Sequence, residues 1–185
     1  MITIRKASVT DAPLLTNLAR KIYQEHYLHL WLPGGAEWYM EQYAYAPHKI
    51  EMEVANANIE YYIITENDKA AGYLKLNLTA LLPGYKEGDA LEVERIYLHA
   101  QSKGKGFGKK MMLLVLQRAI ALQKETIFLK AMDSATSAIG FYQSLGYVVC
   151  DSFQLPLPEF KLMKKQYRGM VILKKELHHL DEKIF

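Results

Sequence analysis

A glycine- and lysine-rich loop at residues 99–110 constrains this chain more than any other stretch of its sequence. Before the loop, residues 91–98 (LEVERIYL) alternate and are rich in β-branched and aromatic side chains, which predicts a strand. After it, residues 111–122 are almost continuously apolar, which predicts a largely buried helix. The loop that turns the strand into the helix contains three glycines at alternate positions and four lysines.

A loop of this kind suits a phosphate group. Glycines let the backbone approach a ligand closely and point successive N–H groups the same way. The start of a helix adds unpaired donors and the positive end of its dipole, and lysines add charge. We therefore predict a pyrophosphate site. The alternative is a plain turn with lysines kept for solubility. The spacing of the glycines matches neither a Walker loop nor a dinucleotide fingerprint.

Length and composition bound the class of protein. At 185 residues, half of them hydrophobic, the chain fits one domain, which we expect over residues 1–177 with a C-terminal tail at 178–185. No apolar run approaches the length of a membrane span, and residues 1–6 open as a strand rather than a signal peptide, which predicts a cytoplasmic protein without a membrane partner. The net charge of +3 is modest, so no nucleic-acid partner is expected.

Cysteine and histidine give no metal-binding pattern, so no metal site is predicted. The single cysteine, Cys150, lies in an apolar run and is predicted to be a packed thiol rather than a nucleophile. Four of the histidines, His26, His29, His178 and His179, are predicted to lie at the surface.

A second segment accompanies the loop. Residues 126–131 predict a buried strand, and Ser134 is a candidate cap for a helix that Gly146 ends. With its strand and helix, the loop resembles motif A of the GCN5-related N-acetyltransferase (GNAT) family, in which Gln/Arg-x-x-Gly-x-Gly/Ala holds the pyrophosphate of acetyl-coenzyme A. Residues 138–147 (AIGFYQSLGY) are similar to the Ala-x-x-Phe-Tyr-x-x-x-Gly-Phe of motif B, and residues 4–12 are similar to the opening of the family.

Two registers of motif A fit the loop. Gln101-x-x-Gly104-x-Gly106 keeps the glutamine of the motif. The other register, Lys103-x-x-Gly106-x-Gly108, puts a lysine there but places the last glycine directly before the helix, at the family's usual distance from the strand. We prefer this second register.

The resemblance implies the fold and the reaction. We expect an α/β (α+β) GNAT fold with a mixed, mostly antiparallel central sheet of about seven strands flanked by helices. The expected activity is transfer of an acetyl group from acetyl-CoA, the cosubstrate, to a primary amine without a metal. Residues 71–76, residues 91–98 and the motif B helix look most like PaiA-type polyamine acetyltransferases, which suggests spermidine as the acceptor. The alternatives are a protein N-terminus or lysine as acceptor, or a non-catalytic CoA-binding sensor; assembly as a homodimer is left open.

The resemblance also assigns roles to residues. In the family, the strand before the loop splays from its neighbour, which leaves backbone amides near Ile96 and Leu98 to hold the pantetheine arm and thioester. Tyr142 is the expected proton donor to the leaving thiolate, with a buried tyrosine in a structural hydrogen bond as the alternative. The coenzyme-binding residues implied are Ile96, Tyr97, Leu98, Lys103, Gly104, Lys105, Gly106, Phe107, Gly108, Lys109, Ala135 and Tyr142. At the position of Ala135 the family often has asparagine.

Two carboxylates are candidates for handling the amine. Glu92 and Glu94 are two residues apart and share a face of an ideal strand. One branch of the family keeps its general base at the position of Glu92. We expect Glu92 to act as the base through water, with Glu94 as a neighbouring anion. Paired surface carboxylates are an equally probable interpretation. For the many aromatic residues at 23–45, core packing of two short helices is favoured over a substrate-side wall.

Overall fold

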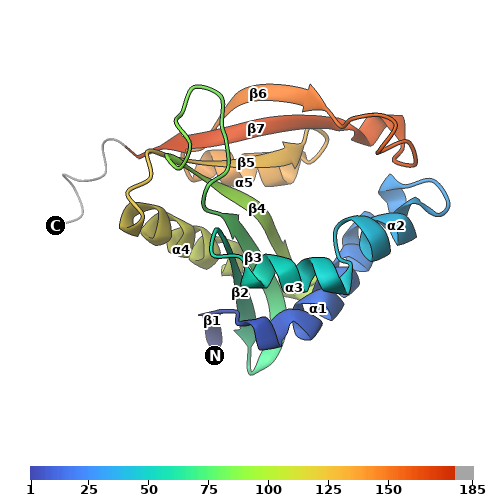
Figure 1. The fold of residues 1–185 in the computed structure, drawn as a ribbon, viewed down its shortest axis with the longest axis horizontal. Helices are drawn as coiled ribbons and strands as arrows, with labels where there is room; N and C mark the ends of the chain where they lie inside the picture. The colour runs from blue at the N-terminus through green and yellow to red at the C-terminus, as the bar shows by residue number, and fades with distance from the viewer. Residues whose placement is uncertain (178–185) are drawn as a thin grey trace.

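The structure, a computed structural model, describes residues 1–177, so the tail predicted at 178–185 lies outside the described residues. One sheet runs through the described part of the chain, in the order β1-β2-β3-β4-β5-β7-β6 (Figure 1). Its strands are β1 (Ile2–Lys6), β2 (Ile59–Glu66), β3 (Lys69–Asn77), β4 (Ala90–Leu98), β5 (Thr126–Met132), β6 (Val148–Gln154) and β7 (Gly169–Glu176). Only β4 and β5 pair in parallel, so the expected mixed, mostly antiparallel sheet is confirmed.

Helices cover both faces of the sheet (Figure 1). One face carries α1 (Ala12–Tyr27), α2 (Gly35–Trp38) and α3 (Pro47–Ala55), and the other carries α4 (Phe107–Ala121) and α5 (Thr136–Ser144). Short helical turns occupy Val9–Asp11, Leu28–Leu30, Ala100–Ser102 and Lys165–Tyr167, and a π-helix spans Tyr39–Tyr43. Each face has its own apolar core, because alternate residues of each strand point to opposite sides.

Local sequence explains two of the connections. The β2–β3 hairpin turns at Asn67 and Asp68, whose φ angles of 49° and 64° are those of a two-residue hairpin turn. Between β1 and α1, the guanidinium of Arg5 forms two hydrogen bonds to the carboxylate of Asp11, at 2.8 and 2.7 Å. This bidentate pair joins the strand to the helix start and accounts for the arginine and aspartate of the opening motif.

A wedge opens in the middle of the sheet. The parallel ladder between β4 and β5 runs from Ala90 opposite Thr126 to Val93 opposite Leu129 and stops there, although both strands continue. On the other side of β4 the register shifts at Glu94, which forms a β-bulge against β3. A bulge bends its strand and increases the local twist. The expected splay of this strand from its neighbour before the loop is therefore confirmed.

The glycine loop and its helix differ from the prediction at their junction. The helix begins at Phe107, and Gly106 is its N-cap residue with a φ of 82°. Gly106, not Gly108, therefore stands directly before the helix. Gly108 lies in the first turn, where a Cβ would come within 3.0 Å of the ring of Phe141. The helix is also less buried than expected, since Leu113 is 56% exposed.

Three smaller predictions were wrong. Ser134 does not cap α5, because the N-cap residue is Ala135, whose N–H donates to the carbonyl of Met132. Cys150 is exposed rather than packed, because it lies on β6, the edge strand that no helix covers. Among the histidines, His29 is exposed as expected, but His26 is half-buried; His178 and His179 lie outside the described residues. Across residues 1–177, no helix has the combination of length and apolar character that crossing a membrane requires.

Candidate active site

A cavity of about 500 Å³ lies in the wedge between β4 and β5. Both splayed strands line it, together with α5 on one side and the aromatic region that follows α1 on the other. Of the residues singled out from the sequence, the cavity wall contains Glu92, Glu94, Ile96, Tyr97, Ala135 and Tyr142. One end of the cavity thus has the predicted proton donor, and one wall has both predicted carboxylates.

The loop between β4 and α4 provides a group of free backbone N–H donors. Across Gly104 to Lys109, the backbone N–H groups have no hydrogen-bond acceptor within residues 1–177. Gly104 and Gly106 have φ angles of 76° and 82°, which favour glycine. Free donors, the helix dipole and exposed lysines are the features that a pyrophosphate needs, so these residues fit the diphosphate of coenzyme A.

Two neighbouring residues at the end of α1 hold this loop. One oxygen of Glu25 lies 2.8 Å from Nδ1 of His99, and the other accepts a hydrogen bond from the N–H of Ala100 at 2.9 Å. His26 has Nε2 at 3.0 Å from the carbonyl oxygen of Leu98 and Nδ1 at 3.3 Å from Nζ of Lys103. These contacts were not predicted, because they join residues more than 70 positions apart.

Tyr142 is buried in the cavity wall, with 8% of its surface exposed. Burial, with a smaller effect of Tyr27, raises the pKa of its phenol well above the ordinary value. Within residues 1–177 its hydroxyl has no hydrogen-bond partner, although it is not sealed from the cavity. The alternative interpretation of Tyr142 required a structural hydrogen bond, and the described part of the chain supplies none.

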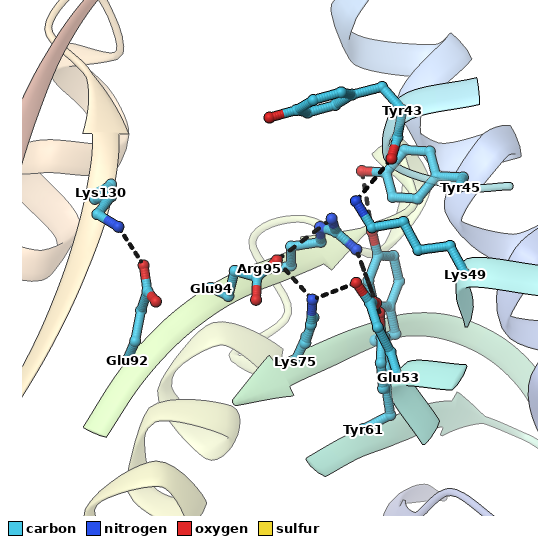
Figure 2. A network of polar contacts seen from close by, with 11 residues as sticks. Tyr43, Tyr45, Lys49, Glu53, Tyr61, Lys75, Glu92, Glu94, Arg95 and Lys130 are labelled. Carbon is cyan, nitrogen blue, oxygen red and sulfur yellow. Dashed lines mark hydrogen bonds and ion pairs between the residues drawn. The ribbon is translucent and has the colours of Figure 1, made fainter. Parts of the chain in front are cut away.

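Both carboxylates of β4 line the cavity, but each is paired with a cation (Figure 2). The Oε1 of Glu92 lies 2.9 Å from Nζ of Lys130. The Oε1 of Glu94 lies 2.7 Å from Nζ of Lys75 and 3.3 Å from the guanidinium of Arg95. In each carboxylate the second oxygen, Oε2, has no partner among the described residues.

The charges around Glu94 form a buried network (Figure 2). The side chains of Lys75 and Arg95 are 3% and 8% exposed, and Glu53 of α3 binds Lys75 at 2.9 Å. Burial works to raise the pKa of Glu53, but Lys75 and Arg95 outweigh it and hold that pKa below its usual value. The two cations and two carboxylates balance, which is the condition for keeping such groups out of water.

Aromatic side chains form the other end of the cavity. The rings that line it are those of Tyr23, Tyr27, Tyr39, Tyr43, Tyr97 and Phe160. Several also pack in the core beside Trp31 and Tyr45, so the core packing expected for residues 23–45 is present, and some of the same rings line the cavity. The segment after β6 completes this wall, and backbone bonds tie it to the region after α1, including Leu32 N–H to the carbonyl of Leu162 at 2.8 Å. Phe160 and Met163 of this segment had no signal in the sequence.

A family model provides the deciding comparison. The model described as the acetyltransferase (GNAT) family matches residues 19–147, which span both splayed strands, the glycine loop and the helix with Tyr142. The chain belongs to the GNAT family. It is accordingly an acetyl-CoA-dependent N-acetyltransferase, with acetyl-CoA as its cosubstrate. Within residues 1–177, no group of three or more His, Cys, Asp or Glu side chains is placed to hold a metal ion.

Individual relatives are distant in sequence. An uncharacterised N-acetyltransferase from the pepI 3′ region of Lactobacillus delbrueckii subsp. lactis is 23% identical over 145 residues, which cover 78% of this chain and 83% of that protein. PaiA N-acetyltransferase from Thermoplasma acidophilum, solved with coenzyme A, superposes with a TM-score of 0.75 at 19% identity, over 96% of this chain and 99% of that one. The ribosomal-protein-S18-alanine N-acetyltransferase from Escherichia coli gives a TM-score of 0.68 at 17% identity, over 100% and 99%. The two structures share the GNAT fold.

Proposed function

We propose that this GNAT enzyme acetylates a small primary amine that enters the cavity and binds against Glu92 and Glu94. The observation that carries the proposal is the pair of free Oε2 atoms on the cavity wall of β4, the strand that also leads to the glycine loop. Two carboxylate oxygens without other partners are suitable acceptors for the hydrogen bonds of an ammonium group.

The amine must lose a proton before it can react. An alkylammonium of pKa near 10.4 costs about 4 to 5 kcal/mol to deprotonate at neutral pH. Glu92 is the better base of the two, because its one cation, Lys130, is 41% exposed and solvated, whereas Glu94 is held by two buried cations. We propose that Glu92 removes the proton through a water molecule and that Glu94 orients the ammonium.

Tyr142 then returns a proton to the leaving thiolate. Bound acetyl-CoA supplies an acyl group already activated as a thioester. Tyr142 suits the donor role because its phenol is protonated at neutral pH and its hydroxyl is not engaged by another described residue, although the burial that raises its pKa also makes it a weaker acid. Ala135 lies beside it on the cavity wall, and the backbone at Ile96 and Leu98 faces the wedge where β5 has moved away.

The proposed coenzyme site covers the wedge and the loop. The free N–H groups of Gly104 to Lys109 would hold the pyrophosphate, with Lys105 adding charge, whereas the N–H of Lys103 already donates to the carbonyl oxygen of Ala100 at 3.3 Å. Lys105 now pairs with Glu66 at 2.9 Å and would have to exchange that exposed partner for phosphate. An exposed pair of this kind contributes little, so the exchange costs little.

Spermidine is one specific candidate for the small amine acceptor. It is supported by the PaiA-like strand, by the coenzyme-bound PaiA neighbour of the same fold, and by tyrosine rings that can face a cation. The ion pairs made by Glu92 and Glu94 count against it, because a polycation must compete with Lys130, Lys75 and Arg95. A protein N-terminus or lysine as acceptor, and a non-catalytic CoA-binding role, are the other candidates.

A panel of acceptors tests the proposal. Thiol release from acetyl-CoA would be measured with spermidine, spermine, amino acids, arylalkylamines and peptides that have a free N-terminus or lysine, with the Glu92→Gln variant as control. We expect turnover of at least one small amine and a strong loss in the variant. Turnover of peptides alone would contradict the small-amine acceptor, and coenzyme binding without turnover of any acceptor would contradict the enzymatic role.

Three further statements stay proposals. We infer that residues 1–177 form a single domain, that the protein is cytoplasmic, and that a homodimer is one assembly to test by light scattering.

A further inference from the structure

We infer that the acceptor is an amino carboxylic acid whose carboxylate binds Lys49, while its amine faces Glu92 and Glu94. This inference rests on the proposed function, because it names the class of amine that the same cavity takes. It follows from the charges on the cavity wall, from the surroundings of Lys49 and from the apolar and aromatic side chains that line the same cavity.

The charges on the wall do not cancel. Lining the cavity are two carboxylates, Glu92 and Glu94, and three cations, Lys49, Arg95 and Lys130. Lys130 balances Glu92, and the buried network of Glu94, Glu53, Lys75 and Arg95 balances itself. Among the described residues Lys49 therefore has no carboxylate partner, and the cavity wall has one surplus positive charge.

Lys49 is held in place with donors to spare. It lies in the first turn of α3, and its Nζ donates to the carbonyl oxygen of Tyr43 at 2.8 Å and sits 5.0 Å from the centre of the Tyr43 ring. An ammonium has three N–H donors, and a single carbonyl does not neutralise its charge. Two donors remain for an anion in the cavity.

A second cation, Arg95, lies near Lys49 but is already paired. The guanidinium of Arg95 lies 5.0 Å from the centre of the Tyr45 ring, and its side chain and that of Lys49 point toward the same region beside Tyr43 and Tyr45 (Figure 2). Because Arg95 is paired with Glu94 at 3.3 Å, the surplus charge that attracts an anion is that of Lys49. Spermidine would bring a further ammonium to this end, whereas a carboxylate would compensate the surplus charge.

The aromatic end of the cavity suits an apolar body. Tyr23, Tyr39, Phe160 and Met163 line the cavity, and burial raises the pKa of Tyr23 and Tyr39, so these rings stay neutral. An amino acid with an aromatic or large apolar side chain has the three parts that this wall can bind: an amine, a carboxylate and an apolar group.

Matched acceptors test the inference. Phenylalanine, phenylalanine amide and phenethylamine share a ring and an amine, but only the first has a carboxylate. We expect kcat/KM to be highest for phenylalanine. Lys49→Met should raise its KM about tenfold or more, the effect of losing a charge-assisted hydrogen bond, and leave phenethylamine nearly unchanged. Lys49→Arg should keep most of the preference, and Lys21→Met, an exposed lysine on α1, is the control.

Product binding separates this inference from the proposed function. N-acetylphenylalanine should bind the wild-type protein in calorimetry and bind Lys49→Met at least tenfold more weakly, whether or not turnover is seen. Turnover of phenethylamine or spermidine in preference to phenylalanine would overturn the inference and leave the N-acetyltransferase function intact. Equal losses for all acceptors in Lys49→Met would also overturn it, because they would indicate a structural role.

Discussion

At Tyr142, burial has two opposed effects on proton donation: it keeps the phenol protonated, and it makes the phenol a weaker acid than an ordinary tyrosine. The side chain is 8% exposed, and the loss of water raises its pKa above that of an ordinary tyrosine. The phenol therefore stays protonated through the neutral and mildly alkaline range, where a thiolate whose conjugate acid has a pKa of about 8.5 must be protonated. Because the raised pKa lies above this range, Tyr142 should add no alkaline limb to the pH profile below about pH 10.

Removing that hydroxyl gives the first prediction at this scale. Tyr142→Phe should lower kcat by about a hundredfold, the usual contribution of a general acid, with little change in coenzyme affinity or Tm. Rapid-mixing kinetics would show whether the chemical step limits turnover. An unchanged kcat under those conditions, or a fall in Tm that matches the loss of activity, would instead support a structural tyrosine.

Glu92 and Glu94 should respond differently to the loss of charge. Glu92→Gln removes a proton acceptor, so kcat/KM should fall most at low pH, where the free amine is scarcer by about tenfold per pH unit. Glu94→Gln should mainly raise KM for the amine, because Glu94 orients rather than deprotonates. Profiles of both variants from pH 6 to 9 test the assignment, and a larger loss of kcat in Glu94→Gln would reverse the two roles.

Sequence identified these side chains but not their partners. Spacing along β4 predicted that Glu92 and Glu94 share a face, and both line the cavity, as does Tyr142 of the motif around Phe141. The ion pair of Glu94 with Lys75 depends on which strands become neighbours and on a bulge in one of them. Neither property is visible in a local pattern, because both arise from contacts between distant residues.

Among the elements, the start of α4 concentrates the predicted coenzyme contacts. Gly106→Val places a β-branched residue at a φ of 82°, so the loop should rearrange and the affinity for coenzyme A should fall at least tenfold. Calorimetry with coenzyme A measures this, and circular dichroism checks that the fold persists. Lys105→Ala should weaken binding less and mainly at low salt. Unchanged affinity in Gly106→Val would contradict the loop assignment.

Gly108 is not an equivalent position, which the preferred register did not anticipate. It lies inside α4, where a Cβ would press on Phe141, so Gly108→Val should act through the contact between α4 and α5. The sequence predicted both helices, but the start of each depends on capping geometry that motif spacing does not contain. The exposed thiol of Cys150 has a related cause, since only strand order makes β6 an edge.

For the whole molecule, the cavity lies where the parallel ladder between β4 and β5 stops, at Val93 and Leu129, while both strands continue. The family resemblance predicted the sheet and the splay of its strands, and the structure has both. It did not predict how the acceptor end is enclosed. That wall combines residues before α3 with Phe160 and Met163, which are more than 100 positions away, and a contact of that range has no local signature.

Helix α1 contributes residues both to the cavity and to the support of the glycine loop. Tyr23 and Tyr27 line the acceptor end of the cavity, while Glu25 and His26 form hydrogen bonds to residues of the loop assigned to the coenzyme. Binding at one site should therefore alter the affinity for the ligand at the other site. Thermodynamic linkage requires that each ligand change the affinity for the other by the same factor. The acceptor would be titrated with and without coenzyme A, and coenzyme A with and without the acceptor. Both experiments should give the same ratio of affinities, and His26→Ala should bring that ratio close to one. The affinity of the enzyme for its second substrate would then depend on whether the first has already bound.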